Sequence, residues 1–162
     1  MRGVSTVVCR EQRRRYQAPG ERPVERDVIF TPDAPWSPGG SSQAIAHNGL
    51  LYVSGQLPID PATGQMLPRP LNPLFGGGDQ AVSAQTRQCL NNVNAICQAA
   101  GADLSNAIKL TIYTPMLIEF AGVIDRVYRE SFAYDPPARS MIGVNVLQGN
   151  ALVQIDAIVA LN

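Results

Sequence analysis

Residues 152–161 read LVQIDAIVAL, and this stretch decides what kind of sheet the chain can form. Polar and apolar side chains alternate along it at the two-residue period of a β-strand. The apolar face consists of Val153, Ile155, Ala157 and Val159, and the opposite face of Leu152, Gln154, Asp156 and Ile158. Such a strand covers a core on one side only, so we expect its second face to meet solvent or another copy of the chain.

Two helices are predicted upstream of this strand. An apolar stripe at helical spacing predicts the first over residues 80–100, with Asp79 as its N-cap and Gly101 as its stop. The second is predicted over residues 118–132, with apolar side chains at steps of three and four. Cys89 and Cys97 fall near the stripe of the first helix, so we expect buried small side chains rather than reactive thiols.

Further strands complete the predicted sheet. They are expected over residues 28–30, 44–46, 50–54, 107–113 and 139–146. Asn48-Gly49 predicts a hairpin turn between the second and third of them, because both turn positions favour positive φ. The resulting order, β-β-β-α-β-α-β-β, predicts an α+β fold in which two helices cover one face of a mostly antiparallel sheet.

The charge is divided unevenly along the 162 residues. Residues 1–26 hold seven arginines and three glutamates, a net of +4, whereas residues 27–162 hold six basic and ten acidic groups, a net of −4. We therefore separate a basic N-terminal arm, 1–26, from a single domain, 27–162. Because this domain is mildly acidic and no stretch has the roughly 20 apolar residues of a membrane span, we expect neither nucleic acid nor a membrane as partner.

The commonest catalytic and metal-binding patterns are missing from the sequence. A single histidine and three cysteines without close spacing argue against a metal site, and no secretory signal precedes them, so a reducing cytoplasm is the expected location. Ser54-Gly55 lacks the nucleophile-elbow pattern. The run Gly76-Gly77-Gly78 lacks the end of a phosphate-binding loop and is better interpreted as a flexible entry to a helix.

One arginine stands out at the start of a late strand, in Pro137-Ala138-Arg139-Ser140. Its guanidinium is suited either to a surface salt bridge or to a bidentate contact with a ligand carboxylate. Met141 lies two residues further along the strand and is expected to share a face with Arg139. Position alone leaves both roles of Arg139 open.

Six segments of the chain resemble, in the same order, the Rid family of reactive intermediate deaminases, also called the YjgF family. They are SQAI (42–45), LYVSGQLPIDPATG (51–64), QTRQCLNN (85–92), AAGA (99–102), PARS (137–140) and VQIDAI (153–158). The resemblance covers about residues 28–160. It implies a chorismate-mutase-like fold, a homotrimeric barrel with clefts between subunits, and hydrolysis of enamines and imines to 2-oxo acids and ammonia without a cofactor.

The resemblance also assigns roles to particular residues. Arg139 matches the arginine that holds the substrate carboxylate, and Gly55 matches the glycine whose backbone N–H meets the ligand, with Ser54 beside it. Met141 stands where the family often has cysteine, at a position that contributes mainly a backbone N–H.

Three positions depart from the family pattern. Ser41 replaces a pocket tyrosine, Asp125 replaces a helix asparagine, and Gln154 replaces the glutamate that positions water. The last change matters most, because an amide can only hydrogen-bond the water whereas a carboxylate can also accept a proton. Asp156, two residues along the same strand face, is a candidate to supply the missing charge.

The leading hypothesis is an imine or enamine deaminase acting on a carboxylated substrate, in which Arg139 holds the carboxylate and Gln154 places the water. A dicarboxylate resembling 2-aminomuconate is one candidate substrate. One alternative is a non-catalytic trimer that binds small carboxylates. Another is the RNA-cleaving or translation-inhibiting role sometimes attributed to relatives, which the acidic domain and the single histidine disfavour. The long loop 65–78 is either a lid over a cleft or a tolerated surface insertion.

Overall fold

A computed structural model describes residues 25–37, 39–74 and 76–161, so nearly all of the predicted arm 1–26 lies outside the described residues. The strands are β1 (Asp27–Ile29), β2 (Ala44–His47), β3 (Leu50–Gln56), β4 (Ala107–Thr114), β5 (Ala138–Gly143) and β6 (Gln154–Ala160). The helices are α1 (Gly78–Ala99) and α2 (Leu117–Ser131), with short 3-10 helices η2 (Leu104–Asn106) and η3 (Gln148–Asn150). The predicted order of strands and long helices is confirmed.

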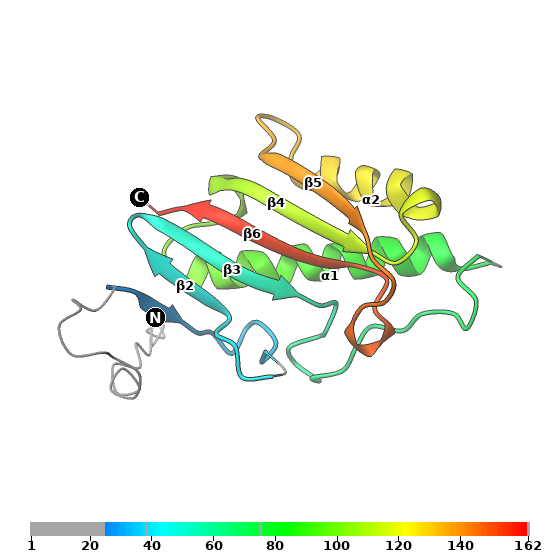
Figure 1. The fold of residues 1–162 in the computed structure, drawn as a ribbon, viewed down its shortest axis with the longest axis horizontal. Coiled ribbons are helices and arrows are strands. Elements are labelled where there is room, and N and C mark those ends of the chain that lie inside the picture. The colour runs from blue at the N-terminus through cyan, green and yellow to red at the C-terminus, as the bar shows by residue number, and fades with distance from the viewer. Residues whose placement is uncertain (1–24, 38, 75, 162) are drawn as a thin grey trace.

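The strands form one six-stranded sheet in the order β1-β2-β3-β6-β4-β5, and both long helices lie behind it in Figure 1. Helix α1 packs on β3 and β6, and α2 packs on α1 and β5. The α+β class and the placement of both helices on one face are therefore confirmed. The side of the sheet that faces away from the helices is called the open face below.

The sheet is mixed, which refines the prediction of a mostly antiparallel one. The pairs β1–β2, β2–β3, β3–β6 and β4–β6 are antiparallel, but β4 and β5 run parallel, with Leu110 opposite Arg139 and Ile112 opposite Met141. Helix α2 connects these two strands as a crossover, which returns the chain to the same end of the sheet before β5 begins. Strand β5 ends at Gly143, three residues earlier than predicted.

The prediction that Asp79 is the N-cap of α1 is wrong. Gly77 occupies that position with φ of 73°, and Asp79 lies inside the first turn. A Cβ atom on Gly78 would lie 1.8 Å from the carbonyl oxygen of Pro73, so this approach of loop to helix requires glycine. At the other end Gly101, with φ of 82°, follows the C-cap Ala100, as predicted.

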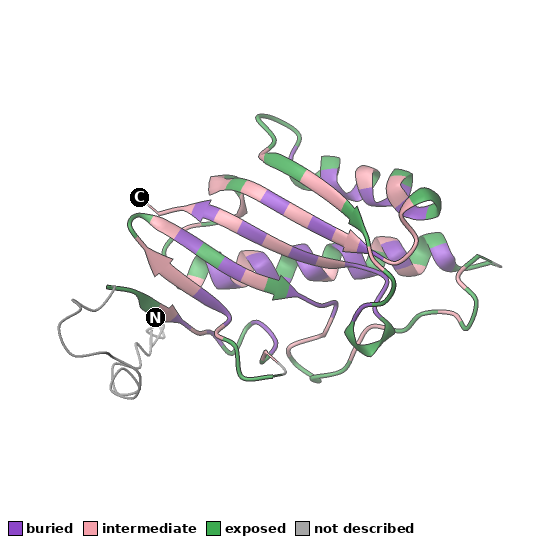
Figure 2. Cartoon of the chain, viewed as in Figure 1, coloured by how far each residue is buried: buried purple, intermediate pink, exposed green. Residues whose placement is uncertain are grey.

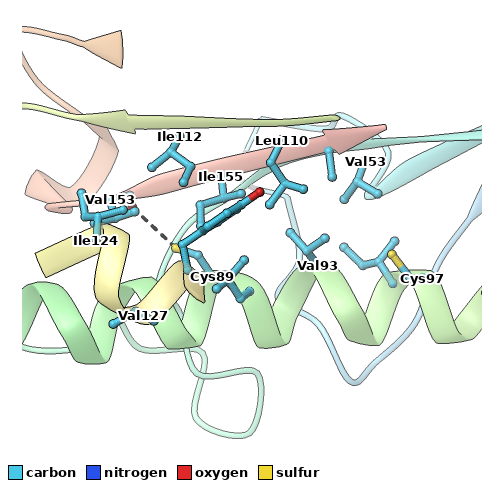
Figure 3. Packing of buried hydrophobic residues seen from close by; sticks show 14 of the residues in the cluster. Val53, Cys89, Val93, Cys97, Leu110, Ile112, Ile124, Val127, Val153 and Ile155 are labelled. Carbon is cyan, nitrogen blue, oxygen red and sulfur yellow. Dashed lines mark hydrogen bonds between the residues drawn. The ribbon is translucent and has the colours of Figure 1, made fainter. Parts of the chain in front are cut away.

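The hydrophobic core fills the layer between sheet and helices (Figure 3). Buried and partly exposed residues alternate along β6, as the sequence predicts, and the same stripes are visible across the sheet in Figure 2. Leu152, however, precedes β6 and is fully buried, so its assignment to the open face was wrong. Cys89 and Cys97 are free and buried in this core, which confirms their predicted structural role.

Buried side-chain amides tie the connecting segments to this core. Gln85 on α1 accepts a hydrogen bond from the backbone N–H of Leu152 and donates to the carbonyl groups of Leu67 and Pro68. Arg69 donates to the carbonyl of Asn150. The first part of loop 65–78 is thus attached to the body of the domain. Among the described residues, neither long helix has the length and apolar character needed to cross a bilayer.

Candidate active site

The candidate site residues fall into two groups, of which the first lies near the end of β3. This group, called the Gln154 cluster, consists of Ser41, Ser54, Gly55 and Gln154. The Ser54 hydroxyl donates to the carbonyl of Ser42, and the Ser54 N–H donates to the carbonyl of Gln43. Ser41, the residue before Ser42, contacts the hydroxyl of Ser37. The loop before β2 is therefore fastened to β3 at this point.

Gly55 and Gln154 are in close contact across the pair β3–β6. The register of this pair shifts between Val53 and Gln56, so that the chain bulges in the segment Ser54-Gly55. A Cβ atom at Gly55 would lie 2.3 Å from Nε2 of Gln154, so only glycine leaves room for the amide in this position. The amide of Gln154 is consequently held directly over the Gly55 backbone.

Asp156 is already engaged by a neighbouring side chain. The hydroxyl of Tyr113 on β4 donates to Oδ2 of Asp156 at 2.9 Å. Burial raises the pKa of Tyr113, and so does its hydrogen bond to the Asp156 carboxylate. Tyr113 is also the register partner of Gln154, so these three side chains occupy the same face of the sheet.

The second group surrounds Arg139 on β5 and is called the Arg139 cluster; it consists of Asp125, Tyr128, Arg139 and Met141. Arg139 and Met141 stand opposite the buried residues Leu110 and Ile112, so they share the helix-facing side of the sheet, as predicted. Met141 packs against the core. Asp125 and Tyr128 come from α2 at a spacing of three, which places both on the helix face that meets β5.

The Arg139 guanidinium is held from two sides. Its Nη1 lies 2.7 Å from Oδ1 of Asp125, and its Cζ lies 4.5 Å from the centre of the Tyr128 ring. The side chains of Arg139 and Asp125 remain 27% and 31% exposed. The two contacts fix the direction of the guanidinium and leave part of it open to a ligand.

Two details of this cluster bear on its chemistry. Oδ1 of Asp125 is buried and, although it forms the ion pair, it accepts no hydrogen bond with suitable angles. Tyr128 donates its hydroxyl to the carbonyl of Pro137, which anchors the turn before Arg139. Burial raises the pKa of Tyr128, and the Arg139 charge opposes that shift in part.

The two clusters lie on opposite sides of the sheet. Gln154 is on the open face, because its neighbour Ile155 points into the core, while Arg139 contacts α2 on the helix side. One chain therefore does not bring Arg139 and Gln154, the two residues predicted to be catalytic, to the same ligand. Any single site that uses both must draw them from two copies of the chain.

Sequence reasoning missed the roles of Tyr128 and Tyr113. Tyr128 belongs to the apolar stripe of the helix predicted over residues 118–132, and that pattern indicates only a core position. Its spacing of three from Asp125 is the signal that places the two side chains on one face. Nothing in the sequence indicated the pairing of Tyr113 with Asp156, because it depends on the register between β4 and β6.

The outer surface of the helices carries a separate shallow groove of about 380 Å³. It is lined by Asp79, Gln80, Ser83, Ala84, Arg87 and Arg126, and Arg87 forms an exposed salt bridge with Glu130. None of the predicted site residues lines this groove. Among the described residues, no group of three or more His, Cys, Asp or Glu side chains comes together.

Comparison with known proteins gives a consistent set of relatives. The sequence model described as endoribonuclease L-PSP matches residues 31–161. A RutC family protein of Sinorhizobium fredii is 44% identical over 83% of this chain and 98% of its own length. The 2-iminobutanoate/2-iminopropanoate deaminase of Bos taurus is 37% identical over 82% of this chain and 88% of its own length.

Solved structures agree with this result. A Rid family protein of unknown function from Yersinia pestis superposes with a TM-score of 0.74 at 35% identity, over 85% of this chain and all of that one. The YjgF gene product of E. coli gives a TM-score of 0.68 at 32% identity, over 80% of this chain and 94% of that one. The sequence match, the curated relatives and the shared fold together show that the chain belongs to the Rid family, also called the YjgF/RutC family.

Proposed function

We propose that this protein hydrolyses 2-imino acids, or the enamines in equilibrium with them, to 2-oxo acids and ammonia, without a cofactor. The observation that carries the proposal is the fixed but partly exposed guanidinium of Arg139, placed to bind a carboxylate. Relatives at 35–37% identity that are named 2-iminobutanoate/2-iminopropanoate deaminases support it.

The chemistry needs little more than binding and one placed water molecule. Arg139 binds the substrate carboxylate, and the backbone N–H of Gly55 helps to orient the ligand. Water, positioned by Gln154, adds to the electrophilic C=N carbon of the protonated imine. One proton of the added water passes to nitrogen, and the C–N bond then breaks. As the C=O group forms, the remaining hydroxyl proton is taken up by the departing ammonia, so the products are the 2-oxo acid and ammonium. Since a protonated imine is already electrophilic, positioning supplies much of the rate.

In this proposal the site lies between copies of the chain, with Arg139 from one subunit and Gln154 from its neighbour. The placement of the two clusters on opposite sides of the sheet supports this arrangement. The open face also carries exposed apolar side chains, among them Tyr52, which is 43% exposed. A homotrimer in which three sheets pack with these faces inward covers them and creates three such sites.

The hydrogen bond between Tyr113 and Asp156 argues against the idea that Asp156 replaces the family glutamate. Its carboxylate already accepts the Tyr113 hydroxyl, so it has less capacity to activate water. Its contribution is tested by Asp156→Asn, which we expect to leave turnover nearly unchanged while Gln154→Ala reduces it.

The experiment that tests the function is a coupled assay. An amino-acid oxidase generates imines from a panel of amino acids, and semicarbazide traps whatever is not hydrolysed. We expect the protein to reduce semicarbazone formation, and Arg139→Ala to abolish the effect. If the wild-type protein leaves semicarbazone formation unchanged across the panel, the deaminase proposal is wrong.

A second candidate function is binding of small carboxylates without turnover. It is favoured by Gln154, which cannot serve as a general base. This alternative predicts that the wild-type protein binds 2-oxo acids but has no activity, and that Gln154→Glu creates activity. Activity in the wild-type protein excludes it.

A further inference from the structure

The ion pair between Asp125 and Arg139 lies where the proposed function requires a carboxylate to bind. A ligand carboxylate that reaches Arg139 therefore also meets the negative charge of Asp125, whose Oδ1 is 2.7 Å from Nη1. In a partly buried site, two carboxylates that share one guanidinium repel each other. A simple anion gains little from this pair, because the positive charge is already compensated.

The pair is also incomplete as a hydrogen-bonded unit. Oδ1 of Asp125 is buried without a hydrogen bond, while almost a third of the side chain is exposed. The same oxygen is charge-compensated by Nη1 of Arg139 at 2.7 Å, but this contact lacks the angles of a hydrogen bond. The exposed part of the carboxylate has acceptor capacity that a ligand can use.

We propose that Asp125 and Arg139 together recognise a zwitterion, which makes Asp125 a specificity-determining residue. This inference rests on the proposed function and refines its substrate. A protonated 2-imino acid carries C=NH₂⁺ directly beside its carboxylate. Its carboxylate pairs with Arg139 while its N–H group donates to Asp125, so that each charge of the ligand meets the opposite charge of the protein.

The same arrangement discriminates against other ligands. A second carboxylate near the first meets Asp125 without a compensating donor, so dicarboxylates of the 2-aminomuconate type are disfavoured. Hydrolysis replaces the N–H donor of the ligand by a carbonyl oxygen. This oxygen and the Asp125 carboxylate are both hydrogen-bond acceptors, so no hydrogen bond forms between them. The 2-oxo acid product therefore binds less tightly than the iminium substrate, and its release is favoured.

Two stable probes separate these effects. 2-Aminobutanoate is a zwitterion with N–H donors beside the carboxylate, and 2-oxobutanoate is a monoanion without them. We expect Asp125→Asn to bind 2-oxobutanoate about tenfold more tightly and 2-aminobutanoate more weakly than wild type, as measured by calorimetry on the full chain. Asp125→Glu, which keeps the charge, is expected to keep the wild-type order of the two affinities.

Glu130→Gln is the matched control, since it removes one carboxylate from an exposed ion pair on the same helix. It is expected to leave both affinities unchanged. The inference is overturned if Asp125→Asn shifts both affinities in the same direction, as a purely structural role predicts, or if wild type binds neither probe. Imine hydrolysis is measured separately, and its absence counts against the proposed function. The role of Asp125 is decided only by whether Asp125→Asn shifts the affinities for the two probes in opposite directions.

Discussion

At the scale of single residues, Gly55 determines where the amide of Gln154 can lie. The φ angle of Gly55 is not in the left-handed region, so alanine is compatible with the backbone at this position. An alanine here would instead clash with the side chain of Gln154. Its Cβ atom would lie 2.3 Å from Nε2, 2.9 Å from Cδ and 3.3 Å from Cγ of Gln154. The glycine is therefore required by a neighbouring side chain rather than by its own conformation.

Gly55→Ala is expected to displace Gln154 and to lower imine hydrolysis strongly. Because Gln154 is flexible and only half-buried, its forced shift costs about 1 kcal/mol or less of the free energy of unfolding. Adding Gln154→Ala removes the clash, so the double variant is expected to regain most of the stability but not the activity. Chemical denaturation of the single and double variants measures this coupling, and equal stability of the two contradicts the contact.

At the scale of elements, α1 is the support on which the sheet and the connecting loops are assembled. Gln85 on its buried face satisfies the N–H of Leu152 and two carbonyl groups at the start of the long loop. Asn92, two turns later, donates to the carbonyl groups of Leu57 and Ile59. These amides connect the backbone of the loops to the helix, in addition to the small hydrophobic cluster in which Leu57 and Ile59 take part.

Replacing Gln85 by leucine is expected to destabilise the domain by about 1–3 kcal/mol, because the buried N–H of Leu152 loses its acceptor. Hydrogen exchange at residues 65–69 is expected to accelerate, since two carbonyl contacts of this segment are lost as well. Gln98→Leu, at an exposed position of the same helix, provides the control. If both variants unfold at the same denaturant concentration, the assigned role of Gln85 is wrong.

Because the thiol of Cys97 on α1 is buried, we expect the domain to lose stability at alkaline pH. Burial, with the nearby negative charge of Asp103, raises its pKa from 9.0 to about 12. Because the folded pKa lies above the unfolded one, the stability contributed by the neutral thiol is present below pH 9 and is lost as the pH rises towards 12. In this interval the free energy of unfolding falls by about 1.4 kcal/mol per pH unit for this group.

Cys97→Ala removes this titration. Its free energy of unfolding is therefore expected to fall less steeply than that of wild type between pH 9 and 12, whatever the difference between the two proteins at pH 7. Urea denaturation at closely spaced pH values measures both slopes. Identical slopes would contradict a buried, neutral Cys97.

Element periodicity explains why so much of the fold could be predicted. The alternation in β6 and the stripe of α2 each report the side of an element that meets the core, so strand order along the chain, helix placement and the shared face of Arg139 and Met141 were correct. The parallel pairing of β4 with β5 and the contact of Asp125 with Arg139 depend on which elements become neighbours. Periodicity within one element carries no information about its partner.

At the scale of the whole molecule, the separation of the two clusters has the largest consequence for function. Arg139 is fixed by α2 on one side of the sheet, and Gln154 lies over Gly55 on the other. No rotation of a side chain carries either group across a packed sheet. The proposed reaction therefore requires an assembly in which the site lies between copies rather than within one 17.4 kDa chain.

This arrangement predicts complementation between two inactive variants. When Arg139→Ala and Gln154→Ala chains are co-expressed with different tags and assemblies that contain both are isolated, some interfaces of the proposed trimer contain both intact residues. In the proposed trimer, every mixed assembly has one interface in three that joins an intact Arg139 to an intact Gln154, so about one third of the wild-type activity is expected. Gly55→Ala mixed with Gln154→Ala is the control without rescue, since both changes damage the same cluster. Mixed trimers no more active than their parents would show that the reaction does not combine Arg139 and Gln154 across an interface.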